Sequence, residues 1–175
     1  MIVKHKFLDN NIPKDTEILI IGTFNPDKEG NEAEYFYGRS RNYLWRILSN
    51  CYQVEDLKGK STNEKIKFAE NHKIAFIDLV KSADYKDKNV DYDDVKLDLH
   101  VHDWNNVDKL VSSLMHLRKV VFTRKTFNDI PNIKKEIDKV HAVCKERNID
   151  YANLVSPARF VNDKKTNEWK LFLLK

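Results

Sequence analysis

The chain has 175 residues, of which 41% are hydrophobic and 33% are charged, and its formal net charge is +4. Such a length and composition are typical of one soluble, ordered domain with a sizeable core, which we expect to span residues 1–175. The 31 basic residues only slightly outnumber the 27 acidic ones, which excludes a polybasic tail. Binding to nucleic acid would therefore require a local cluster of positive charge.

The cysteines and the apolar runs indicate the compartment. Cys51 and Cys144 lie far apart without CxxC spacing, as expected of reduced thiols in a reducing environment. No apolar run approaches the roughly 18 residues that span a bilayer, and the first ten residues lack the apolar stretch of a signal peptide. We therefore expect a cytoplasmic protein without membrane contact. No sign of an oligomer interface stands out in the sequence, and we expect a monomer.

The first half of the chain combines buried strands with helices. Gly22 closes a continuous apolar run, and a single acid, Asp78, interrupts a second run, IAFIDLV. Ser61 and Glu64 have the spacing of a capping box at the start of a helix. The predicted elements are, in order, a strand over 17–21, a helix over 42–51, a helix over 61–71 and a strand over 74–80.

The second half continues this alternation after an interruption. Residues 84–103 are rich in Asp, Lys and Tyr, and this composition predicts an irregular connection with little core. The elements predicted beyond it are an amphipathic helix over 105–117, a buried strand over 119–123, a helix over 132–147, a strand over 151–155 and a short helix over 169–174. Alternating strands and helices predict an α/β fold, a three-layer α/β/α sandwich with a short, mostly parallel central sheet.

The stretch from residue 18 to residue 48 is the most informative part of the chain. It begins with ILIIGTFNPD and, after a short polar loop, continues with YFYGRSRNYLWRIL. A junction between a strand and a loop at the edge of an α/β sheet is where ligands usually bind. Aromatic faces mixed with Arg guanidinium groups can hold an unstacked nucleobase and its phosphates.

Five segments in one order carry a resemblance to a known family. They are Gly22-Thr23-Phe24-Asn25-Pro26, Phe36-Tyr37-Gly38-Arg39-Ser40-Arg41-Asn42-Tyr43-Leu44-Trp45, Ile77-Asp78-Leu79-Val80, Thr123-Arg124-Lys125-Thr126 and Leu154-Val155-Ser156-Pro157-Ala158-Arg159-Phe160. With these segments the chain resembles the uracil-DNA glycosylase superfamily, and most of all its hypoxanthine-DNA glycosylase branch. The likeness covers residues 18–160.

This resemblance implies a DNA glycosylase of base-excision repair. Such an enzyme flips a deaminated base, hypoxanthine or uracil, out of DNA and hydrolyses its N-glycosidic bond without a metal or another cofactor. Many relatives place a water-positioning Asp or Asn where this chain has Phe24. The hypoxanthine branch is understood to use the Asn of its Arg-Asn segment instead, which here is Asn42. The alternative is that Asn42 caps the helix that follows, and the two roles are compatible.

The resemblance also implies how a base would be held. Tyr37 matches the aromatic residue that stacks on the flipped base, although it could instead pack in the core or a loop. Asn25 stands where the family has Pro, and an Asn-Pro turn explains it structurally. Asp78 would be costly if buried without a partner, so we expect it to bond to a loop or to border the pocket. The predicted base-binding residues are Gly22, Thr23, Phe24, Asn25, Tyr37 and Asp78.

The loop after the last strand is the segment that would enter the DNA. Arg159 would fill the gap left by the flipped base or contact phosphate; alternatively, this is an ordinary loop with an exposed Arg. The predicted DNA-binding residues are Arg39, Arg41, Arg124, Lys125, Ser156, Pro157, Ala158 and Arg159.

Two positions motivate other readings of the same sequence. Relatives that act strongly on uracil have a His where this chain has Leu154, and Phe24 is a second apolar residue at a usual catalytic position. The chain could therefore be a nucleic-acid-binding paralogue with weak or lost catalysis. A hydrolase of free nucleosides or nucleotides is a further alternative. His100 and His102 lack further ligands at convincing spacing, so we expect no metal site.

Overall fold

The computed structural model describes residues 1–85 and 93–175, and its larger sheet contains four parallel strands. In sheet order these are β3 (Ile74–Asp78), β2 (Ile18–Gly22), β6 (Lys119–Phe122) and β7 (Asp150–Asn153). Gly22 lies opposite Asp78, and Phe122 lies opposite both Ile21 and Asn153. The carboxyl ends of the four strands are therefore level at one edge of the sheet.

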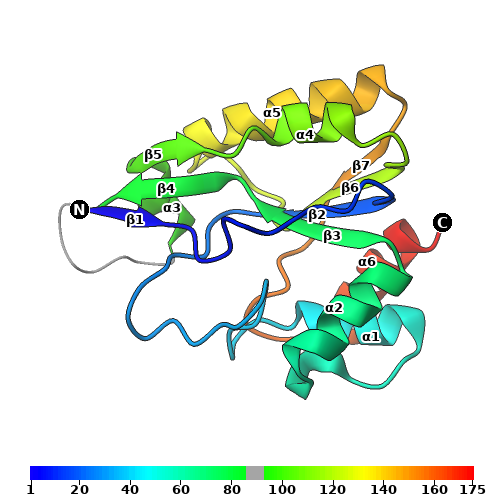
Figure 1. Cartoon of the computed structure of the whole chain (residues 1–175). Coiled ribbons are helices and arrows are strands. Elements are labelled where there is room, and N and C mark those ends of the chain that lie inside the picture. Colours follow the sequence, from blue (N-terminus) through cyan, green and yellow to red (C-terminus); the bar gives the residue numbers. More distant parts are fainter. Residues whose placement is uncertain (86–92) are drawn as a thin grey trace.

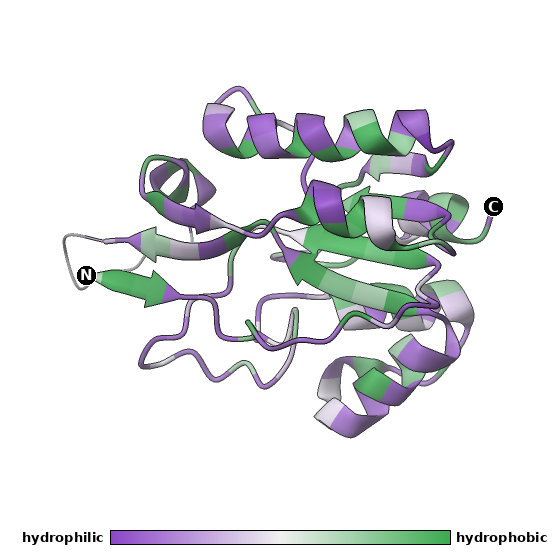
Figure 2. Cartoon of the chain, turned by 45° about the horizontal axis from the view of Figure 1, so that its top comes forward, coloured by the Kyte–Doolittle hydropathy of each residue, from purple (hydrophilic) through white to green (hydrophobic). Residues whose placement is uncertain are grey.

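Helices cover both faces of this sheet (Figure 1). Leu19 and Ile21 of β2 pack into a core with Ile133, whereas Ile18 and Ile20 point into the opposite core. One face carries α4 (Val107–Ser113) and α5 (Pro131–Glu146). The other face carries α1 (Leu44–Tyr52), α2 (Thr62–Asn71) and α6 (Asp163–Leu173). The short 3-10 helix η1 (Leu57–Gly59) follows α1. Figure 2 shows the central strands as mostly hydrophobic between helices of mixed character. The predicted α/β/α sandwich with a mostly parallel sheet is confirmed.

A second, antiparallel sheet was not predicted. It consists of β1 (Ile2–Lys4), β4 (Val80–Asp84) and β5 (Val101–Trp104), in the order β1-β4-β5. Only Leu79 separates β3 from β4, so the strand predicted over 74–80 is in fact the end of one sheet and the start of another. The apolar run continues across the change of partner, and its pattern therefore carries no sign of the boundary.

The expectation of an irregular connection over residues 84–103 was wrong for the part that the structure describes. This part contains the short helix α3 (Asp94–Asp98) and strand β5. Leu97 is buried, and the Asp98 carboxylate accepts a hydrogen bond of 2.6 Å from the backbone nitrogen of Ile133 at the start of α5. The low apolar content of this segment gave no indication of these elements, because polar groups and not apolar contacts fix α3 to its neighbours. Residues 86–92 of the same prediction lie outside the described residues.

The last helix is longer than the prediction of 169–174. It begins at Asp163, because the side chain of Asn162 accepts a hydrogen bond of 2.9 Å from the backbone nitrogen of Lys165 and so caps its first turn. Trp169 lies in the middle of this helix and is fully buried.

No helix in the described part of the chain is long and apolar enough to cross a membrane. The expected single domain over residues 1–175 stays a prediction.

Candidate functional site

Gly22, Tyr37 and Asp78 meet at the level strand ends. A methyl group on Gly22 would collide with the Oδ1 atom of Asp78 and would lie 2.7 Å from the hydroxyl of Tyr37. Glycine is therefore required here so that two polar side chains can lie directly against the backbone of β2. Three residues predicted to bind a base are thus brought together, and we call them, with Thr23, His5, Asp94 and Arg124, the strand-end cluster.

Asp78 is held by a histidine from the N-terminal arm. The Nε2 atom of His5 lies 2.7 Å from Oδ2 of Asp78, and both side chains are buried. The backbone nitrogen of Phe7 donates to Nδ1 of His5 over 3.0 Å. In this arrangement Nδ1 accepts a hydrogen bond, so Nε2 carries the ring proton and donates a hydrogen bond to the Asp78 carboxylate. Sequence reasoning missed His5, because no local pattern links it to Asp78.

The backbone of Tyr37 has a strained conformation, with a φ of 55°. The Tyr37 ring packs at 5.9 Å against the ring of Phe76. The hydroxyl is buried near the Thr123 side chain, yet it makes no hydrogen bond of normal geometry to any residue that the structure describes. Burial, and next the nearby charge of Asp78, raise the pKa of Tyr37 well above its usual value. The hydroxyl therefore stays protonated and can donate a hydrogen bond.

Tyr37 and Arg159 have positive φ angles that lie away from any helix end. Arg159 has a φ of 74°, and three further non-glycine residues have positive values, namely Gln53, Lys73 and Asn148. Gln53 directly follows α1, and Lys73 and Asn148 lie two residues beyond the ends of α2 and α5, where a left-handed residue is a common way to end a helix. Tyr37 and Arg159 have no such explanation, and strain of this kind concentrates at functional sites.

A carboxylate from α3 completes the strand-end cluster. The Oδ2 atom of Asp94 lies 2.8 Å from Nη1 of Arg124, and the Thr23 side chain also contacts Asp94. Burial raises the pKa of Asp94, and the Arg124 guanidinium opposes that rise. Sequence reasoning missed Asp94, because it lies in the segment predicted to be irregular.

The segment with Asn42 is joined to the loop that follows β7, and we call residues 39–43 and 156–160 the paired loops. Asn42 and Ala158 form an antiparallel bridge. The backbone nitrogen of Tyr43 donates to Pro157 over 2.9 Å, and that of Arg159 donates to Arg41 over 2.8 Å. The fold thus joins the predicted catalytic segment to the predicted DNA-inserting loop.

The side chain of Asn42 has a structural role. Its Oδ1 atom accepts a hydrogen bond of 3.0 Å from the backbone nitrogen of Leu44, the first residue of α1. The N-cap residue of α1 is Tyr43, which makes no side-chain cap bond, so Asn42 supports the helix start from one position earlier and is not its cap. This bond does not use the amide nitrogen of Asn42, so the catalytic alternative stays a prediction beside it.

Two lysines donate hydrogen bonds to backbone oxygens of the paired loops. The Nζ atom of Lys58 donates to the backbone oxygens of Ser40 and Asn42 at 2.7 and 2.5 Å. The Nζ atom of the buried Lys165 donates to those of Ala158 and Phe160 at 3.1 and 2.8 Å. Each positive charge thus fixes loop carbonyl groups.

Replacing Lys165 by Met is expected to loosen the second of the paired loops. The variant removes two charge-assisted hydrogen bonds, which should lower the free energy of unfolding by about 1–3 kcal/mol. Arg159 is exposed and lies between the two carbonyl groups, so limited digestion with trypsin should cut after it faster. Lys164→Met, at an exposed position of the same helix, is the control, and equal digestion of both variants would contradict the role of Lys165.

The predicted DNA-binding cations differ in their surroundings. Arg124 pairs with Asp94 and Asp129, and Lys125 pairs with Glu168 over 2.7 Å. Arg41 and Arg159 are exposed on the paired loops. Arg41 and Arg159 are thus open to solvent, whereas carboxylates engage Arg124 and Lys125.

The remaining predicted base-binding residues are largely buried. Phe24 packs against the ring of His5 at 5.9 Å. The Oδ1 atom of Asn25 accepts a hydrogen bond of 3.0 Å from Asn31, whereas its buried Nδ2 atom has no partner in the described residues. Asn25 therefore has an explanation as a residue of the polar loop, as well as one donor left over.

Comparisons with known proteins agree with this arrangement at the level of the fold. No family model matches the chain, and no curated protein does. The structure is similar to the solution NMR structure of a protein from Methanosarcina acetivorans named as a "putative uracil DNA glycosylase", with a TM-score of 0.63. The match covers 93% of this chain and 91% of the other, at 19% sequence identity. The chain has a uracil-DNA-glycosylase-like fold.

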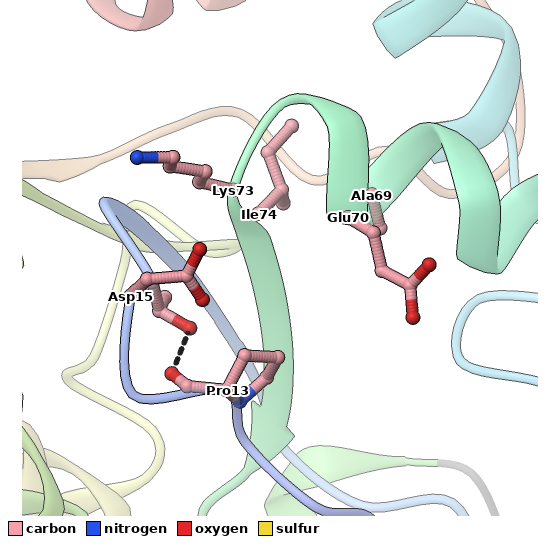
Figure 3. Close-up of a pocket in the computed structure, with 7 residues that line it drawn as sticks. Pro13, Asp15, Ala69, Glu70, Lys73 and Ile74 are labelled. Carbon is pink, nitrogen blue, oxygen red and sulfur yellow. Dashed lines mark hydrogen bonds between the residues drawn. The ribbon is translucent and has the colours of Figure 1, made fainter.

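In this uracil-DNA-glycosylase-like fold a small cavity lies far from the strand-end cluster. It has a volume of about 270 Å³ and lies beside the start of β3, at the other end of the strands (Figure 3). Its lining includes Pro13, Glu70 and Lys73. Within residues 1–85 and 93–175, no three His, Cys, Asp or Glu side chains are arranged to hold a metal ion.

Proposed function

We propose that this protein is a DNA glycosylase that excises a deaminated base, hypoxanthine or uracil, from DNA by hydrolysis. One observation carries the proposal: the segment with Asn42 and the loop with Arg159 are bonded to each other, although they lie far apart in the chain. A glycosylase needs its catalytic segment next to the loop that opens the duplex, and the uracil-DNA-glycosylase-like fold supports the same function. We assign the protein to the hypoxanthine-DNA glycosylase branch, acting as a cytoplasmic monomer on DNA.

The strand-end cluster has groups that suit such a base. Hypoxanthine and uracil both present a carbonyl oxygen next to an N–H group. The Asp78 carboxylate, fixed by His5, can accept a hydrogen bond from that nitrogen. The Tyr37 ring would stack on the base, an interaction worth about 1–3 kcal/mol.

The paired loops would act on the sugar and the duplex. Arg41 and Arg159 would contact phosphates, and residues 156–159 would fill the gap that the flipped base leaves. The amide of Asn42 would position the water that attacks the sugar. No metal takes part in this mechanism, so activity should persist in EDTA.

The test is base release from labelled oligonucleotides that carry uracil, hypoxanthine or xanthine, single- and double-stranded, with EDTA present. Removal of the Asn42 amide is expected to slow excision by about 10²- to 10³-fold. Asn42→Ser is the sharpest variant, because the Ser hydroxyl can still accept a hydrogen bond from the backbone nitrogen of Leu44 while it lacks the amide. Asn42→Ala loses this bond as well and should cost about 1 kcal/mol of stability.

Three results would contradict this proposal in different ways. Excision at the wild-type rate by a folded Asn42→Ser variant would remove Asn42 from the mechanism. No release from any of these oligonucleotides, with retained duplex binding, would favour a nucleic-acid-binding paralogue. The burial of Phe24 and Leu154 in the apolar core favours that second candidate. Action on free nucleosides without salt-dependent duplex affinity would indicate a nucleoside hydrolase instead.

A further inference from the structure

Asp94 and Arg124 form an ion pair in the strand-end cluster, and further bonds fix Arg124. Beyond its bond to Asp94, Arg124 holds both oxygens of Asp129 at 2.7 and 2.8 Å and donates from Nε to the Thr126 backbone oxygen over 2.7 Å. All three nitrogens of the guanidinium group are thus engaged by the protein. Arg124 therefore serves to fix the Asp94 carboxylate.

Asp94 and the Tyr37 hydroxyl lie at the same edge of the sheet. Arg124, which binds Asp94, follows β6, and the hydroxyl lies against Gly22 at the end of the neighbouring strand β2. The Thr23 side chain, which follows Gly22, contacts the carboxylate, and the charge of Asp94 acts on both Tyr37 and Asp78. The buried hydroxyl of Tyr37 points independently to a missing ligand at this place, because buried polar groups normally have partners. A carboxylate and a buried hydroxyl without a regular hydrogen bond thus lie at one edge of the sheet.

Hydrolysis of an N-glycosidic bond benefits from a group that takes a proton from water. The amide of Asn42 can orient water but cannot serve as a base at neutral pH. The Asp78 carboxylate is 7% exposed and occupied by His5, whereas the side chain of Asp94 is 24% exposed. Among these groups, Asp94 alone is a carboxylate that water can reach.

We propose that Asp94 is a further catalytic residue, the general base of the hydrolysis, and that Arg124 is its positioning residue. This inference rests on the proposed glycosylase function. Asp94 accepts one proton from the water as the water oxygen bonds to C1′ of the sugar. The bond between C1′ and the base nitrogen breaks, and its electron pair leaves with the base. The proton then passes from Asp94 to the departed base, so one water is consumed and the neutral base is released.

The pH dependence follows from the groups around this carboxylate. Burial raises the pKa of Asp94, bonds from Arg124 and Thr23 lower it, and the negative charge of Asp78 raises it. In the described part of the chain, the charge of Asp94 also acts on Tyr37. A general base must be ionised, so the excision rate should fall as the pH drops through the raised pKa of Asp94. This acidic limb should lie above the pH range expected for an ordinary Asp.

The experiment compares single-turnover excision by wild type, Asp94→Asn and Asp129→Asn between pH 4 and pH 9, on the oligonucleotide that wild type cleaves. Asp94→Asn should be slower by about 10²- to 10⁴-fold and should lose the acidic limb. Asp129→Asn removes the other carboxylate of Arg124 and should keep the limb. Duplex affinity should be the same for all three proteins. Added formate should partly restore activity to Asp94→Ala, because it supplies a carboxylate that a purely structural role would not use.

Several results would overturn the assignment. An Asp94→Asn variant with the wild-type rate, or a slow variant that keeps the acidic limb without rescue of Asp94→Ala by formate, would reject Asp94 as the base and leave the glycosylase function standing. Wild type that releases no base from any of the oligonucleotides would overturn the proposed function and this inference together. Circular dichroism on each variant separates these outcomes from loss of the fold.

Discussion

Replacing Gly22 by Ala is expected to disable the site and to destabilise the protein. The new methyl group would collide with the Asp78 carboxylate and press on the Tyr37 hydroxyl at 2.7 Å. Asp78 cannot retreat freely, because His5 holds its other oxygen at 2.7 Å inside the protein. Overpacking of this kind costs about 1–3 kcal/mol. Misplacement of site groups by about 1 Å can cost about 10²-fold in rate, so excision should fall by at least that much.

Urea unfolding and single-turnover excision check this expectation. Gly59→Ala is the control, because a methyl group on Gly59 would meet no atom within 4 Å. The control should keep both its stability and its rate. If Gly22→Ala excises as fast as the control, then the close approach of Asp78 and Tyr37 to β2 is not needed for activity.

Replacing Trp45 by Ala is expected to give the largest loss of stability. Its side chain is 1% exposed and packs against the ring of Phe76 at 5.2 Å, between α1 and the sheet. Truncation of a buried Trp to Ala costs about 3–5 kcal/mol. The indole nitrogen also donates to the backbone oxygen of Phe36 over 2.8 Å, directly before Tyr37. The loss should therefore also release the loop that places Tyr37.

Trp45→Phe separates packing from hydrogen bonding. It keeps an aromatic ring and leaves the Phe36 oxygen without its donor, which should cost about 1–3 kcal/mol. Urea unfolding followed by circular dichroism measures both variants. If Trp45→Phe retained wild-type stability and excision, the bond to Phe36 would have no part in holding Tyr37.

The local patterns of the chain predicted most elements of the central sandwich. The apolar run closed by Gly22 is β2, buried along its whole length. The capping box predicted at Ser61 and Glu64 is present with both of its hydrogen bonds. These predictions hold because a buried strand and a helix start depend on residues close together in the chain, and such residues meet in any fold that buries the segment.

The sequence predicted less where polar residues fix a structural element. Residues 93–103 contain a helix and a strand, although their composition indicated neither. Asp98 holds α3 to the start of α5, and Asp94 holds it to Arg124. A hydrogen bond between distant polar groups has no signature in the residues that flank either partner, so composition suggested a solvated connection instead.

The residues of the candidate site also differ in whether the sequence alone could propose them. The resemblance of their segment to a known family was enough to propose Tyr37 and Asn42, and Gly22 and Asp78 also stand in apolar runs that indicate strands. Only the tertiary structure placed His5 on Asp78 and paired the segment of Asn42 with residues 157–159. The physical reason is that these contacts depend on which strand ends are level and on which connections cross there. The order of strands in the sheet decides both, and no stretch of a few residues encodes that order.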